Sequence, residues 1–271
     1  RSTGEDIARG ERIIAAGRRL MPQDIALAAA TGHRQLPVRR PLRVAVLSTG
    51  NELVKPGSRL KPGTIYDSNR AMLLALLGRF GARVHDLGML PDDPKSLTEH
   101  LHEAALRNDL ILSSGGVSLG EEDHVKAAVE ATGQLVFWRL AIKPGRPLAM
   151  GVVRGVPFIG LPGNPAAAYV TFAMFVRPIL AHLAGAALQT VTSFRVRSTF
   201  SQRKRAGRRE YVRVNILSGS DGVPEARRFP KEGAALLTSL TTTDGIAEIP
   251  EEVTAVSAGD FLTFYPHGAF W

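Results

Sequence analysis

The sequence predicts an α/β protein with a doubly wound, mostly parallel sheet, a small C-terminal all-β domain and a short N-terminal segment. Residues 41–186 alternate short β-branched apolar runs with stretches of helical periodicity, which is the pattern of repeated βα units. Residues 187–271 instead hold short strands between clusters of Gly, Asp, Ser and Pro, which favours a small barrel or sandwich. Residues 1–40 are too short to hold a core of their own.

The composition of the chain indicates which kinds of partner it can bind. Its 271 residues are 44% hydrophobic and 22% charged, which is ordinary for a globular protein of about two domains. The net charge of +9 favours anionic partners: nucleic acid, anionic lipid, phosphorylated metabolites or oxyanions. The lack of cysteine excludes disulfides and thiol chemistry and agrees with a cytoplasmic location. The first residue is not Met, and we expect the chain to start inside a longer protein.

One helix is expected in the N-terminal segment. Pro22 suits its first turn, and Gly32 ends it. Ile25, Leu27 and residues 28–30 carry its apolar face.

The central region then alternates strands and helices. Its most apolar helix, residues 166–183, is interrupted by Thr171, Arg177, Pro178 and His182, so we expect a buried core helix and no membrane span. The expected central strands are 43–47, 83–87, 110–112, 135–140, 148–153 and 158–161, the helices 72–80, 95–107, 125–132 and 166–183, and the C-terminal strands 194–198, 211–217, 245–249 and 261–265.

Polar loops rich in Gly and Pro follow the expected central strands. Ligands of an open α/β sheet bind beyond the carboxyl ends of its strands, so these loops are expected to converge on one edge and form a site. The loops are Thr49-Gly50-Asn51-Glu52, Pro91-Asp92-Asp93-Pro94, residues 113–123, Lys143-Pro144-Gly145-Arg146-Pro147 and Leu161-Pro162-Gly163-Asn164-Pro165.

The loop at residues 113–120 has the composition of an anion-binding turn. Ser114, Gly115, Gly116 and Ser118 can direct amides and hydroxyls towards an anion near a helix N-terminus. A tight strand-to-helix turn is the plainer interpretation, but four small residues in a row and three closing acids favour a site. The loop has neither the P-loop lysine motif nor the dinucleotide fingerprint, so P-loop nucleotide hydrolysis is not expected.

Three acids in separate loops are candidate metal ligands. Glu52, Asp92 and Asp123 together offer the oxygen donors that Mg²⁺ prefers, and this ion commonly bridges one or two carboxylates to a substrate phosphate. Each acid alone is more often a helix cap or a solvated loop residue, and Asp92 and Asp93 can cap the next helix.

Cations frame a stiff turn. Lys143 and Arg146 lie on either side of Pro144-Gly145, and Arg139 is just upstream. Two prolines would hold these cations at fixed positions, where they can stabilise a phosphate or an oxyanion. The alternative is a solvated basic turn.

The last loop begins the long apolar helix. Asn164 is a good N-cap and Pro165 suits the first turn. Capping does not require Pro162 and Gly163, which force a second fixed turn. We therefore include the whole loop in the candidate site.

Arginines of the last region are also candidates. Arg208 and Arg213 would project towards the site if the β domain leans over it, whereas residues 203–205 are by default a solvated hairpin. Small β-barrels also bind nucleic acids, but the aromatic residues here are too few and too alternating to form a stacking platform. We do not expect a nucleic-acid partner.

Five motifs in one order give the chain a specific resemblance. It resembles the molybdopterin molybdenumtransferase family, of the MoeA and gephyrin E-domain type, and lacks about the N-terminal third of such proteins. Residues 1–40 then correspond to the remnant of an N-terminal linker domain, 41–186 to a molybdopterin-binding domain and 187–271 to a C-terminal β-barrel domain. The motifs are residues 48–53 (STGNEL), 65–69 (IYDSN), 113–123 (SSGGVSLGEED), 141–147 (AIKPGRP) and 161–165 (LPGNP).

The resemblance implies an activity. The family takes adenylylated molybdopterin and molybdate, and releases AMP while molybdenum is attached to the dithiolene, with Mg²⁺ required. Members are homodimers whose cleft is completed by the partner subunit, and a molybdopterin adenylyltransferase is a further expected partner. By position, the implied functional residues are the acids Glu52, Asp92, Asp123 and Asp6, the cations Lys143, Arg139 and Arg208, and the prolines Pro162 and Pro165.

The chain departs from the family at a few positions, and other functions stay open. Arg139 stands where lysine is common, and Ala166-Ala167 replace a pair that usually includes serine. A catalytically silent pterin-binding or scaffold module is one alternative. A molybdopterin adenylyltransferase is another, but it would carry a different Gly-rich loop and no β domain. A basic nucleic-acid binder would show steep salt dependence.

Overall fold

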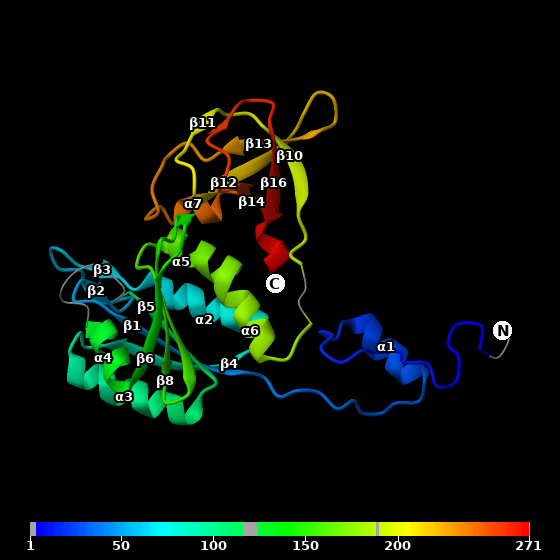
Figure 1. Ribbon diagram of the computed structural model, residues 1–271, viewed down its shortest axis with the longest axis horizontal. Coiled ribbons are helices and arrows are strands. Elements are labelled where there is room, and N and C mark those ends of the chain that lie inside the picture. Colours follow the sequence, from blue (N-terminus) through cyan, green and yellow to red (C-terminus); the bar gives the residue numbers. More distant parts are fainter. Residues whose placement is uncertain (1–3, 116–123, 188–189, 271) are drawn as a thin grey trace.

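The computed structural model describes residues 4–115, 124–187 and 190–270. Figure 1 shows three parts: an N-terminal arm that carries helix α1, an α/β body and a β-rich lobe that lies over one side of the body. The arm extends away from the sheet, whereas the C-terminal end of the chain returns to the body beside helix α6.

The body is built on a six-stranded mixed sheet. Its strand order is β4 (Arg83–Leu90), β1 (Arg43–Thr49), β5 (Leu110–Ser114), β9 (Val156–Leu161), β8 (Pro147–Val153) and β6 (Gly133–Arg139). The first four strands run parallel, as the repeated βα units predict, and β8 and β6 are antiparallel to their neighbours. A two-residue turn at Arg154-Gly155 joins β8 to β9, and such a short connection can only join antiparallel strands.

Both faces of the sheet are covered by helices. Along β1, Val44 and Val46 pack with α2 (Ser68–Phe80) on one face, and Ala45 and Leu47 pack with α3 (Pro94–Arg107) and α4 (His124–Thr132) on the other. A strand buried on both sides needs an uninterrupted apolar run, which is why this strand shows no alternation in the sequence. The prediction of a doubly wound α/β fold is confirmed.

The long apolar helix belongs to the core of the body. It comprises α5 (Pro165–Thr171), a π-helical segment (Phe172–Val176) and α6 (Arg177–Leu183). Its length and composition would allow it to cross a membrane, but 56% of its most apolar 18-residue stretch is buried inside the protein. Pro178 lacks an N–H and its ring clashes with the carbonyl four residues earlier, which accounts for the local change to π geometry just before it.

The C-terminal lobe is a small closed barrel. Its strand order is β13 (Pro224–Arg228), β10 (Phe194–Ser198), β16 (Phe261–Pro266), β14 (Gly245–Ile249) and β12 (Arg209–Ser218), and β12 pairs back onto β13. Buried valines and other apolar residues fill its interior. Smaller elements are the pairs β2 (Leu53–Val54) with β3 (Ile65–Tyr66) and β11 (Gln202–Arg203) with β15 (Ala255–Val256), helix α7 (Thr238–Thr241), and a 3-10 helix at His267–Phe270.

Strand β12 also joins the lobe to the body. Its first two residues pair in parallel with β7 (Ile142–Lys143), the middle of the strand pairs with β14 and its end pairs with β13. The Arg209 amide donates a further hydrogen bond to the Ala141 carbonyl at 2.9 Å. A continuous backbone ladder therefore connects the two parts of the molecule.

The arm differs from the expectation in one respect. Helix α1 (Pro22–Ala30) begins at Pro22 as the sequence predicts, but Ile25 of its expected apolar face is 53% exposed. Only Asp24 and Ala28 of this helix are buried, and Asp24 forms an ion pair with Arg18 at 2.8 Å. The periodicity correctly predicts a helix, but no other part of the described chain covers this face.

Candidate functional site

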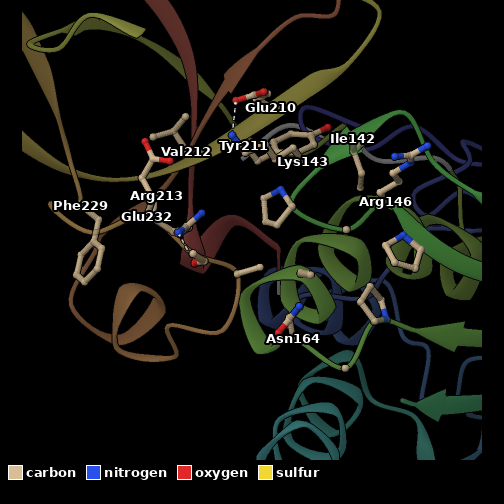
Figure 2. A pocket seen from close by; sticks show the side chains of 18 of the residues that line it. Ile142, Lys143, Arg146, Asn164, Glu210, Tyr211, Val212, Arg213, Phe229 and Glu232 are labelled. Atoms are coloured by element: carbon tan, nitrogen blue, oxygen red, sulfur yellow. Dashed lines mark hydrogen bonds and ion pairs between the residues drawn. The ribbon is translucent and has the colours of Figure 1, made fainter. Parts of the chain in front are cut away.

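A cavity of about 610 Å³ lies where the body meets the barrel, and Figure 2 shows its lining. The body contributes the ends of β5 and β9, the turn after β7 and the start of α5, and the barrel contributes β12 and the chain after β13. The residues singled out from the sequence that line this cavity are Glu52, Gly115, Lys143, Arg146, Pro162, Gly163, Asn164, Arg208 and Arg213.

The turn after β7 is held tightly against the body. Gly145 has φ +112°, and a Cβ at this position would lie 2.4 Å from Oγ1 of Thr171 on helix α5. Only glycine tolerates both the backbone conformation and the close approach. Lys143 and Arg146 therefore lie on either side of a turn that packs closely against α5.

Glu210 holds two cations at the joint between body and barrel. Its side chain is 3% exposed, and its carboxylate lies 2.6 Å from Nη2 of Arg208 and 3.5 Å from Nζ of Lys143. The amide of Gln202 donates a third contact at 2.8 Å. A buried charge is tolerated when partners of opposite charge and hydrogen bonds surround it. Glu210 thus fixes two of the candidate site cations beside each other.

Sequence reasoning missed Glu210, although a signal was present. Glu210, Val212 and Val214 alternate along β12 and so share one face, on which both valines are buried. An acid on the same strand face as buried valines is expected to be buried as well, so it needs a cation or a hydrogen-bond donor as its partner. The preceding Arg208-Arg209 is the nearest source of a partner.

The barrel side of the cavity carries further cations. Arg213, Arg228 and Lys231 line it together with Glu232. Arg213 donates from Nη2 to the Gly233 carbonyl at 2.9 Å and from Nε to Oγ of Ser239 at 3.2 Å. Burial lowers the pKa of Arg213, and the nearby charge of Arg228 lowers it further.

The loop at residues 161–165 is positioned by helix α2 rather than by its own cap. The Asn69 side chain donates to the Gly163 carbonyl at 2.8 Å. Asn164 occupies the N-cap position of α5, but its side chain makes no capping hydrogen bond within the described structure, so the expected cap is wrong. Its side chain is part of the cavity lining instead, and Figure 2 shows it beside the turn of α5.

The acids cluster at the end of β1. The Glu52 carboxylate folds over Gly50, where a Cβ would lie 2.7 Å from Oε2, and Oδ1 of Asp92 accepts from Oγ1 of Thr49 at 3.3 Å. The capping role that the sequence left open falls to Asp93, which accepts from the Ser96 amide at 2.8 Å. Asp92 is therefore available for another role.

Carboxylates are the donors that Mg²⁺ prefers, but of the acids Glu52 and Asp92 only Glu52 lines the cavity, and Asp92 lies outside its lining. Within the described ranges 4–115, 124–187 and 190–270, no group of three His, Cys, Asp or Glu residues is arranged to hold a metal ion. Asp123, the third candidate ligand, lies outside these ranges, as do Gly116 and Ser118.

The remaining candidates lie away from the cavity lining. Asp6 is exposed on the arm, and Arg139 is exposed at the end of β6. Ser114 is 3% exposed at the end of β5, and Pro165 opens α5 behind Asn164. Gly115, which does reach the cavity, is held so close to the Thr49 carbonyl that a Cβ would lie 2.6 Å from it.

Two family models match this chain. One is described as a probable molybdopterin binding domain and matches residues 45–182, and the other is described as the MoeA C-terminal region (domain IV) and matches residues 195–266. A molybdopterin molybdenumtransferase of Haemophilus influenzae is 37% identical over 98% of this chain and 66% of its own length. The molybdenum cofactor synthesis protein cinnamon of Drosophila melanogaster is 36% identical over 92% of this chain and 41% of its own length.

Solved structures give the same picture for the whole described fold. The molybdopterin biosynthesis MoeA protein of Pyrococcus horikosii superposes with a TM-score of 0.81 and 32% identity, over 97% of this chain and 64% of that one. A molybdenum cofactor biosynthesis protein of Pyrococcus furiosus superposes with a TM-score of 0.73 and 28% identity, over 97% and 82%. The chain spans about two thirds of the length of the Haemophilus influenzae relative.

Proposed function

Because the chain belongs to the MoeA-type molybdopterin molybdenumtransferase family, we propose that it transfers molybdenum from molybdate to adenylylated molybdopterin, with release of AMP. The observation that carries the proposal is the interdomain cavity with Lys143 and Arg208 held side by side by Glu210. Both substrates are anions, and a cavity that accepts them together has to offset their mutual repulsion.

The cations of the cavity supply this compensation. Lys143 is part of a fixed turn, and Arg208 presents a planar guanidinium that can bind two oxygens at once. Among the described residues, the Nε atom of Arg208 is buried without a hydrogen-bond partner, and so is Oε1 of Gln202 next to it. Unpaired buried polar atoms at a cavity are costly, and a bound ligand or water that pairs with them removes the cost.

Glu52 and Asp92 would hold Mg²⁺ at the end of β1, with Asp123 as a third ligand by family resemblance. The ion would neutralise charge on the phosphoryl group and assist the departure of AMP. The residues of the chain perform the other tasks. Arg208 and Lys143 bind and orient the anions, and the loop at residues 161–165 shapes the cavity floor.

AMP release tests the proposal directly. Purified protein is incubated with adenylylated molybdopterin, molybdate and Mg²⁺, and AMP is measured by chromatography. We expect Lys143→Ala and Arg208→Ala each to lower the rate about 10²-fold or more, because each removes a charge that faces developing negative charge. Lys95→Ala removes an equal charge from the exposed first turn of α3 and is the control. Unchanged rates in Glu52→Ala and Asp123→Ala would exclude the magnesium role.

A second candidate function follows from the match of residues 45–182 to a probable molybdopterin binding domain. This match alone would also suit a pterin-binding module that does not turn over. Binding of molybdopterin without molybdate-dependent AMP release would identify this function.

We further propose that the protein acts in the cytoplasm as a homodimer and receives its substrate from a molybdopterin adenylyltransferase. The apolar side chains exposed on the arm, Ile25 at 53% and Val38 at 68%, support an additional protein contact. Light scattering on the purified chain tests the oligomeric state, and a monomer at micromolar concentration would contradict the dimer.

A further inference from the structure

One acid of the cavity is placed differently from the others. Glu210 is buried in its cation pair on β12 and Glu52 is exposed over Gly50 at the end of β1, whereas Glu232, whose side chain is 71% exposed, pairs with Arg228 on the barrel side of the cavity. Glu232 lies on the chain segment that follows β13 and lines the cavity with Arg213 and Arg228. Its carboxylate is therefore an exposed negative charge among the cationic residues on the barrel side of the cavity, which we call the cationic wall.

The backbone directly after Glu232 is anchored, whereas the Glu232 side chain is exposed. Arg213 donates to the Gly233 carbonyl at 2.9 Å, and the Ala166 amide of α5 donates to the Ala234 carbonyl at 2.9 Å. The carboxylate itself makes one ion pair with the described part of the chain, 2.6 Å from Nη2 of Arg228. Releasing that pair needs only a change of side-chain rotamer and no movement of the loop.

The positive charges that act on the Glu232 carboxylate belong to both the body and the barrel. Arg228 lowers the pKa of Glu232 most, and Lys143 of the body and Arg213 of the barrel lower it further. Glu232 is thus ionised and offsets the positive charge of Arg228, Lys143 and Arg213, all of which line the cavity. An anionic ligand that enters the cavity meets these cations already paired.

We propose that Glu232 is a resident counter-anion that occupies the cationic wall in the free protein and is displaced by a phosphate or oxyanion group of the ligand. The nature of the ligand rests on the proposed function, but the displacement does not require turnover. A carboxylate and a phosphate compete for the same guanidinium donors, and the doubly charged group makes the stronger pairs. Glu232 would therefore favour dianions over weaker anions.

The test compares anion binding by the wild-type protein, Glu232→Gln and Glu252→Gln. Glu252 is an exposed acid of the barrel outside the cavity lining, so its substitution changes the net charge equally without touching the wall. Calorimetry measures the dissociation constants of inorganic molybdate and of AMP in separate titrations at fixed ionic strength. We expect Glu232→Gln to bind at least one of them about twofold to fivefold more tightly, the range of an exposed ion pair.

The two probes identify the group that displaces the carboxylate. A gain for molybdate alone assigns the wall to the oxyanion, and a gain for AMP alone assigns it to the nucleotide phosphate. Unchanged or weaker binding of both anions by Glu232→Gln would overturn the proposal, since Glu232 would then only orient Arg228. An equal gain in Glu252→Gln would also overturn it, because the effect would be one of net charge.

A parallel assay separates this inference from the proposed function. If the wild-type protein releases AMP from adenylylated molybdopterin but Glu232→Gln shows no tighter binding, only the counter-anion role fails. If Glu232→Gln binds more tightly while neither protein releases AMP, the counter-anion role stands and the proposed activity fails.

Discussion

At the scale of single residues, the cavity depends on cationic side chains that are positioned by a buried acid. Lys143 and Arg208 could be picked out from the sequence because each lies in or near a recognisable loop or charge run. The acid that holds them, Glu210, is 3% exposed; it belongs to the barrel, as Arg208 does, and only Lys143 reaches it from the body. A sequence contains no periodicity for a contact between two domains, so the pairing of Glu210 with Lys143 could not be predicted, whereas its pairing with the nearby Arg208 left a signal.

Removing the charge of Glu210 should loosen this arrangement. We expect Glu210→Gln to lower the free energy of unfolding by about 1–3 kcal/mol, since hydrogen bonds to charged groups of a buried carboxylate are lost. Urea denaturation measures this change. The control is Glu130→Gln, an exposed acid of α4, for which a change within about 0.5 kcal/mol is expected. Equal stabilities of the two variants would mean that Glu210 contributes nothing through its charge.

At the scale of elements, the βα pattern located the loops that build the body side of the cavity. The strands of the body could be predicted because a parallel sheet needs long apolar runs. Strands β7 and β13 could not be predicted from the sequence. Strand β7 has two residues, and β13 reads Pro-Glu-Ala-Arg-Arg, so neither shows a strand pattern. Backbone pairing to the long β12 creates both, and with them the barrel side of the cavity.

The turn after β7 offers a matched pair of substitutions. Gly145 and Gly155 both have positive φ, but of the two only Gly145 has a neighbour, Oγ1 of Thr171, within contact distance of the Cβ that alanine would add. Both alanine variants carry the backbone cost of about 1 kcal/mol. We expect Gly145→Ala to be less stable than Gly155→Ala by a further ~1–3 kcal/mol, the typical cost of overpacking. Thermal unfolding compares them, and equal melting temperatures would show that the turn can move.

At the scale of the whole molecule, the C-terminal end fastens the barrel to the body. The Tyr169 hydroxyl of α5 lies 2.7 Å from Nδ1 of His267, and Arg177 of α6 donates to the Phe270 carbonyl at 2.8 Å. Oγ1 of Thr243 lies 3.3 Å from the other ring nitrogen of His267. Burial lowers the pKa of His267, and the nearby Asp244 only partly offsets this effect.

This contact should make stability depend on pH. Because the pKa of His267 is lower in the folded state, the unfolded chain binds more protons as the pH falls through its usual value of about 6.5. The contribution of His267 is thus present above a pH of about 6.5 and is lost as the pH falls through the lowered pKa. Urea unfolding between about pH 7.5 and 5 should show a smaller slope in His267→Gln than in the wild type. His33→Gln, on the exposed arm, should keep the wild-type slope.

Strand β12 has a mechanical consequence for access to the cavity. The body and the barrel share one ladder of backbone hydrogen bonds. Separating them would break the pairs of Arg209 with Ile142 and of Glu210 with Lys143. Figure 2 shows the ion pair that joins Glu210 of the barrel to Lys143 of the body. We therefore expect a ligand to enter past side chains of the cavity lining while the body and the barrel stay joined.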